Sequence, residues 1–135
     1  MSDHETAIQT ALIAWLKDDA ALQALLGDPA RIWDEAPEGA GYPRLTLGRS
    51  ESRPVGADGC GIEHRLTLTC ASTFRGTEEA KAVVAAVRAR LQDAALEGGG
   101  VRTIGLSVVF SDVFRSADHR RTWAVMRVRA MTEDI

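Results

Sequence analysis

The sequence predicts one α+β domain, a two-layer sandwich in which helices cover one face of a mainly antiparallel sheet. Its length of 135 residues suits a single folded unit, residues 1–135. Several segments alternate apolar and polar residues, as half-buried strands do. Others repeat apolar residues every three or four positions, which is typical of amphipathic helices. Short connections between successive strands favour antiparallel pairing.

Two helices are expected at the start of the chain. "SDHE" fits a capping box, with Ser2 as the N-cap and Glu5 reaching back. Apolar residues at helical spacing then predict a helix over residues 3–17. Asp19 can cap a short second helix, which Gly27 ends.

Three strands are expected next. Residues 31–33 and 43–50 are strand candidates, and the loop between them, "DEAPEGAG", contains breakers that sustain neither helix nor ladder. Residues 62–72 alternate cleanly between apolar and polar side chains, as a half-buried strand does. Residues 51–61 are rich in breakers, so we expect a mobile loop or an extended β-hairpin arm there.

The second half predicts a helix and two strands. Thr77 can cap "EEAKAVVAAVRARLQDA", which has acids in its first turn and arginines later, as the helix dipole favours. The glycines at 98–100 end that unit. Strands are expected at 101–114 and 122–131, joined by "RSADHRR".

The net charge of −3 conceals a polarity along the chain. Residues 1–42 carry eight acids against two cations, whereas residues 99–131 carry six arginines against two acids. Such an asymmetry can steer association with a charged partner. A bias in genomic composition is the alternative explanation.

No catalytic motif emerges. The three histidines, His4, His64 and His119, are dispersed, and no phosphate-binding glycine motif is present. Asp118 beside His119 could form a relay with Ser116, but turn chemistry explains those residues without a function. We therefore predict that the protein is not an enzyme and uses no cofactor.

Metal binding is weakly supported by the sequence. Cys60 and Cys70 make no metal-ligand set, and Cys70 continues a buried alternation. Asp34, Glu35 and Glu38 could bind a divalent cation, but they lack the regular spacing of a calcium loop. A solvated acidic loop is the favoured interpretation, and no metal site is predicted.

Aromatic and charged residues near strand ends are the candidate interface. Trp33, Tyr42 and Trp123 lie beside charged residues, where an aromatic ring suits an interface, although the tryptophans could equally cap the core. The full predicted set is Trp33, Asp34, Glu35, Glu38, Tyr42, Arg115, Arg120, Arg121, Trp123, Arg127 and Arg129.

The order of three segments resembles a known family. They are "RIWDEAPEGAGYPRLTLG" from residue 31, the helix opened by "RGTEEAK", and the "RTW" that starts the last strand. Over about residues 5–131 the chain is similar to the tail-completion, or tail-terminator, proteins of long-tailed bacteriophages and gene transfer agents. The resemblance implies a lambda-type tail-terminator fold and a non-enzymatic, structural role.

The resemblance also implies partners and a location. Such proteins form a hexameric ring on the head-proximal end of the tail tube. The ring stops tube polymerisation and presents a surface to the neck, or stopper, protein. We accordingly expect a virion component at the head–tail junction, assembled in the host cytoplasm. Since the sequence has no apolar run of about 18 residues and is acidic overall, we also expect no membrane partner and no sequence-specific nucleic acid.

A ring needs one patch to meet a different patch on the next subunit. We predict that Asp34, Glu35 or Glu38 of one subunit faces Arg127 or Arg129 of its neighbour, and that the 51–61 arm contacts the tail tube. Two alternatives stay open. One is a neck or head-closure protein, a stopper or adaptor of the same particle, and the other is a small metal- or ligand-binding α+β domain.

Overall fold

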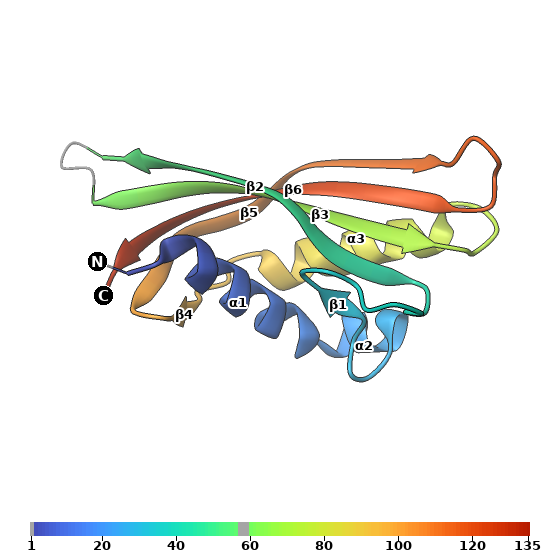
Figure 1. Ribbon diagram of the computed structural model, residues 1–135, viewed down its shortest axis with the longest axis horizontal. Coiled ribbons are helices and arrows are strands. Elements are labelled where there is room, and N and C mark those ends of the chain that lie inside the picture. Colours follow the sequence, from blue (N-terminus) through green and yellow to red (C-terminus); the bar gives the residue numbers. More distant parts are fainter. Residues whose placement is uncertain (1, 57–59) are drawn as a thin grey trace.

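Nine elements make up the computed structural model, which describes residues 2–56 and 60–135 (Figure 1). In chain order they are α1 (His4–Lys17), α2 (Ala20–Leu26), β1 (Ile32–Trp33), β2 (Arg44–Val55), β3 (Gly61–Ser72), α3 (Glu78–Leu91), β4 (Glu97–Gly98), β5 (Val101–Arg115) and β6 (Thr122–Asp134). The predicted α+β class and order of elements are confirmed. Only the two-residue strand β4 was not predicted.

The strands form one six-stranded sheet in the order β1-β2-β3-β6-β5-β4. β1 pairs with β2 in parallel, with Ile32 opposite Leu45, and every other pair is antiparallel. The sheet is therefore mixed, and it curls into a half-barrel (Figure 1). A curled, mixed sheet does not confirm the predicted two-layer antiparallel sandwich.

The core lies between the sheet and the helices. β3 contributes Leu66, Leu68 and Cys70, and β6 contributes Met126 and Val128, each at most 1% exposed. Their period of two places them all on the helix-facing side. Burial raises the pKa of the Cys70 thiol to about 12, as suits the predicted buried thiol.

The helix caps follow the sequence with one correction. Asp3, not Ser2, caps α1: its carboxylate accepts from the backbone N–H three residues on, at 3.0 Å. Ser2 instead hydrogen-bonds Asp134 at the end of β6, which lowers the pKa of that carboxyl. Asp19 caps α2 as predicted. Thr77 occupies the N-cap of α3 without a side-chain cap bond.

Strands β2 and β3 continue as an arm beyond the core (Figure 1). Pairing extends to Val55 opposite Gly61, past an irregularity between Leu47 and Ser50. The predicted 51–61 segment is therefore an extended hairpin arm. Residues 57–59 of that segment lie outside the described residues.

Two histidines are buried around one hydroxyl on the inner side of the sheet. The Thr132 hydroxyl lies 2.8 Å from both His4 Nδ1 and His64 Nε2, so it can donate to one ring and accept from the other. His4 Nε2 lies 3.2 Å from an Asp134 carboxylate oxygen. His64 Nδ1 has no hydrogen-bond partner among the described residues. Desolvation consequently lowers the pKa of His64 below its ordinary value.

We predict that this histidine makes the fold sensitive to mild acid. The unfolded chain binds the His64 proton more readily, so the free energy of unfolding falls as pH drops below the unfolded pKa of about 6.5. One proton contributes a slope of at most about 1.4 kcal/mol per pH unit. Urea unfolding between pH 7 and pH 5 should show a smaller loss in His64→Gln than in the wild type. An identical loss in both proteins would contradict this role.

Candidate assembly surface

The acidic loop between β1 and β2 is anchored at its base by arginines. Arg31 donates from Nε to the Pro43 carbonyl at 2.8 Å and from Nη2 to the Tyr42 carbonyl at 3.0 Å. Arg44 donates to the Ala40 carbonyl at 3.3 Å and to the Tyr42 hydroxyl at 3.2 Å. The cationic side chains that hold the loop therefore bond its carbonyls and its tyrosine.

The predicted acids project from this anchored loop. Asp34, Glu35 and Glu38 are all exposed. Within residues 2–56 and 60–135, none of the three forms an ion pair. The same part of the chain contains no group of three or more residues that could hold a metal ion. The three carboxylates thus form a solvated negative patch.

The turn between β5 and β6 is held by its own side chains. Ser116 donates to Asp118 Oδ1 at 2.6 Å, and Asp118 also accepts from the Arg120 backbone N–H at 3.0 Å. These bonds, the Ser116 bond first, lower the pKa of Asp118. Arg115 donates to the carbonyl of His119, which has a φ of +57°. Asp118 and Ser116 are occupied in forming a turn that presents arginines.

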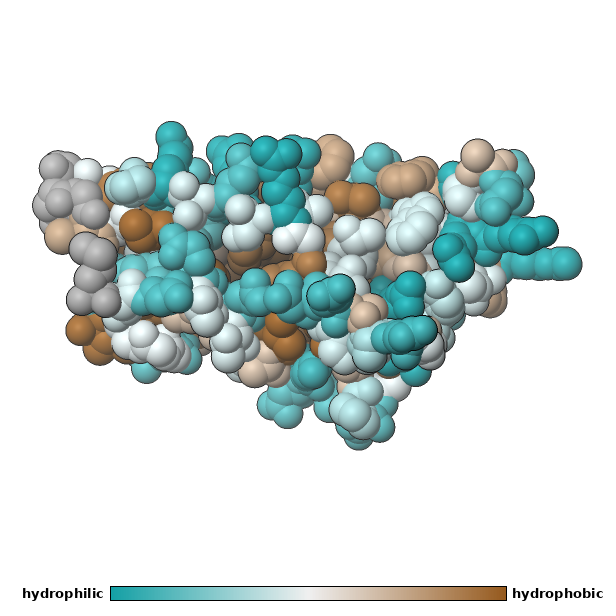
Figure 2. Space-filling view, viewed as in Figure 1, coloured by the Kyte–Doolittle hydropathy of each residue, from teal (hydrophilic) through white to brown (hydrophobic). Residues whose placement is uncertain are grey.

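Tyr42 brings the acidic loop and the basic turn together in one subunit. The Arg44 and Arg121 guanidinium carbons lie 4.5 and 5.3 Å from its ring centroid, within cation–π range. The loop between β1 and β2 lies on the helix side of the sheet near α2, and the β5–β6 turn lies at the end of the long axis opposite the hairpin arm (Figure 1). Hydrophilic residues project from this end in the space-filling view (Figure 2).

The structure separates the remaining predicted arginines from that end. Arg127 and Arg129 lie on the open face of the sheet, the face away from the helices. Arg129 donates to Glu63 Oε2 at 3.2 Å from Nε and at 2.8 Å from Nη2. Arg127 lies over the Phe110 ring at 5.4 Å. The two neighbouring arginines therefore have different surroundings.

Glu63 is the centre of a charge cluster on the open face. Its side chain is only 5% exposed, because Arg53 at 3.3 Å, Arg65 at 3.7 Å and Arg129 cover it. The Arg129 hydrogen bond, followed by that of Arg53, holds the pKa of the carboxyl below its usual range. The cluster carries more positive than negative charge, so the face is basic although the chain is acidic overall.

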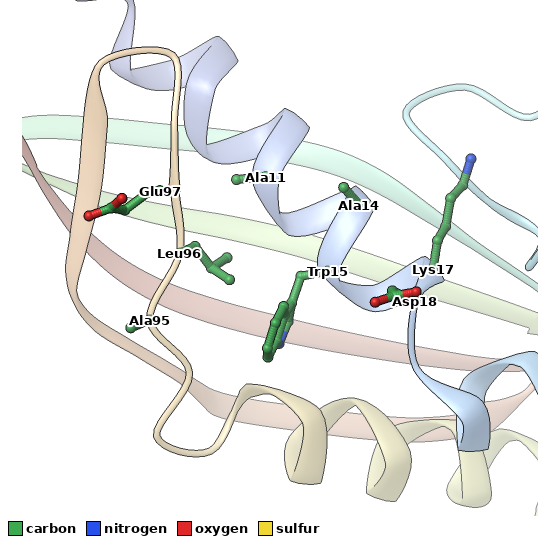
Figure 3. A pocket seen from close by; sticks show the side chains of 8 residues that line it. All are labelled: Ala11, Ala14, Trp15, Lys17, Asp18, Ala95, Leu96 and Glu97. Atoms are coloured by element: carbon green, nitrogen blue, oxygen red, sulfur yellow. The ribbon is translucent and has the colours of Figure 1, made fainter.

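A shallow groove of about 560 Å³ lies between α1 and the segment before β4 (Figure 3). Trp15 forms one wall, and its Nε1 donates to the Arg90 carbonyl at 2.9 Å. The Arg90 guanidinium stacks on the indole at 3.6 Å and returns a bond to the Trp15 carbonyl at 3.0 Å. Alanines line much of the rest. The groove brings together no nucleophile and base.

Comparison with known proteins identifies the family. The family model described as "Tail completion protein gp17" matches residues 10–133. This chain belongs to the tail completion family. The resemblance seen in the sequence is thereby confirmed.

A solved structure agrees with that membership. A chain from the "Virion of native gene transfer agent (GTA) particle" superposes with a TM-score of 0.87 at 26% identity, covering 97% of this chain and 98% of that one. No curated protein matches the sequence. No helix in the described part of this tail completion protein is long and apolar enough to cross a membrane.

Sequence reasoning missed two features of the surface. Glu63 belongs to the alternating segment 62–72, but its enclosure depends on register: it lies opposite Arg53 on β2 and two residue rows from Arg129 on β6. The exposed rings of Phe110 and Phe114 on β5 were also missed. Bulges interrupt the alternation of that strand, and so the apolar residues that face solvent could not be told from those facing the core.

We predict that the Glu63 charge stabilises the sheet. In Glu63→Gln the three arginines lose their shared counter-charge, so the urea midpoint should fall. Glu51→Gln is the matched control, because its partner Arg49 is 78% exposed and exposed pairs contribute little. Since the pKa of Glu63 is lowered in the folded protein, its contribution should begin to fall below the pKa of an ordinary glutamate and disappear as pH falls through the lowered folded pKa. Equal midpoints for the two variants would count against this role.

Proposed function

We propose that the protein forms a ring on the head-proximal end of a tail tube, ends polymerisation there and presents a docking surface to the neck. The observation that supports this best is the near-complete structural match to a chain of a gene transfer agent virion. Together with the family, it makes this chain a structural tail protein of a virion or virion-like particle. The ring, its hexameric number and its two partners are our inference.

The shape of the subunit supports two partners on opposite sides. The β2–β3 arm extends from one end of the long axis, and the β5–β6 turn, whose Arg121 contacts Tyr42, lies at the other (Figure 1). We assign the arm to the tail tube, because it extends beyond the core of the subunit. The other end, with Trp33, Tyr42, Arg121 and Trp123, is assigned to the neck. Because the helices cover only one face of the sheet, the other face stays accessible next to both the tail-tube contact and the neck contact.

Within the ring, we assign the negative patch to a neighbouring arginine. Asp34, Glu35 and Glu38 are exposed and form no ion pair in the described part of their own subunit. Arg129 already has Glu63 as its counter-ion, whereas among the described residues Arg127 contacts the face of an aromatic ring and forms no ion pair. Arg127 is therefore the stronger candidate of the predicted pair.

Tail-tube assembly tests the proposed function. Purified tube protein of the same particle is polymerised with and without this chain, and tube lengths are measured by electron microscopy. Addition during growth should give shorter tubes with one blunt end. Unchanged lengths, with binding to portal–adaptor complexes instead, would assign the protein to head closure. Binding to neither would refute both assignments.

We predict that reversing Arg127 weakens the ring. Arg127→Glu should lower self-association at least about tenfold, as loss of an interfacial charge pair does, without lowering the thermal midpoint. Arg75→Glu, a reversal at another exposed arginine, is the control. Asp34→Arg in the Arg127→Glu background should restore association. Unchanged association in Arg127→Glu would reject the pairing.

A further inference from the structure

Strand β5 presents a long open edge. β4 pairs with it only at Val101 and Arg102, and no other described strand pairs on that side. Four large apolar side chains of β5 are 44–55% exposed: Ile104, Val109, Phe110 and Phe114. The strand contains no proline and no lysine, the residues that commonly protect an edge. Such an edge is a template for pairing with another chain.

The opposite edge of the same sheet is open over the same rows. β1 pairs with β2 only at Leu45 and Thr46, which leaves the following residues of β2 unpaired on that side. One row of residues crosses the sheet as Ser50, Leu66, Val128 and Val108. The two short strands cover opposite ends of these edges, so the middle rows of both β2 and β5 are free.

We propose that β5 of one copy pairs antiparallel with β2 of the next copy, so that the ring is one continuous sheet. The inference rests on the ring of the proposed function and names its interface. β2, β3, β6 and β5 alternate in direction. A rotation about an axis along the strands preserves direction and therefore places β2 of the next copy antiparallel to β5. Pairing of two different edges is the heterologous contact that closes a ring.

Charge complementarity favours a second copy as the occupant of this edge. β1 lies beside Leu45 and Thr46, and Thr46 shares a row with Asp112 of β5. Asp34 directly follows β1. If the rows of the sheet continue from one copy into the next, Asp34 of the next copy lies beside the β5 edge, near Phe110. Arg127 lies opposite Phe110 and over its ring. The same pairing of edges thus brings Asp34 of one copy toward Arg127 of its neighbour.

Cysteine cross-linking tests the edge directly. Ser50→Cys and Val109→Cys are made singly and together in a Cys60→Ser background, and treated with a short bis-maleimide. Purified tail tubes are present, so that a ring formed only on its template is captured. The double variant should give a ladder of covalent oligomers, and each single variant should stay monomeric. Dimers from Val109→Cys alone would show β5 pairing with itself and overturn the proposal, as would the absence of any ladder.

A substitution on the β5 edge tests the β5–β2 interface independently of the proposed function. Val109→Lys adds a cation to an exposed side chain and should reduce self-association at least about tenfold while the fold persists. Phe74→Lys is matched in chemistry and exposure, at 46% against 55%, but lies off the edge. If Val109→Lys still associates and blunts tubes as the wild type does, the edge is wrong and the function stands. If the wild type itself fails to blunt tubes, the function fails, and the cross-linking pattern still decides the edge.

Discussion

The unbroken pairing of β3 with β6 is the constraint on which the rest of the structure depends. Twelve residues of each strand pair in register, from Gly61 with Glu133 to Ser72 with Thr122, with no irregularity. The outer strands β2 and β5 each carry bulges against these two. Because side chains alternate along a strand, this register fixes both faces of the sheet. A slip of one residue would turn the core leucines outward and the arginines inward.

Both faces of that pair have consequences beyond the core. On the inner face the register allows Thr132 to lie between two histidines. On the open face it places Glu63 among arginines and leaves Arg127 beside an aromatic ring. β2 and β5 flank this central pair and form the two long edges of the sheet. Each edge is covered only in part, β2 by the two-residue strand β1 and β5 by the two-residue strand β4. A domain built this way has exposed edges and faces that suit assembly.

Periodicity and turn chemistry predicted most of the fold. The helix boundaries, the Asp19 cap and the alternation of residues 62–72 are local properties, so spacing along the chain reveals them. The parallel pairing of β1, the curl of the sheet and the Glu63 cluster depend on which strands meet and in what register. A charge count placed acids and arginines at opposite ends of the chain, yet Tyr42 and Arg121 lie in contact. Contacts between segments that are distant in the sequence depend on the order in which the strands pair, and the spacing of residues along one sequence predicts that order poorly.

Above all, we propose that this chain ends a tail. Electron microscopy of particles assembled with a gold-labelled version of the chain tests it most directly. We predict label at one position only, the head-proximal end of each tail tube, including tails that have not yet joined a head. Label along the tube, at the distal tip, or only on heads that lack tails would contradict it.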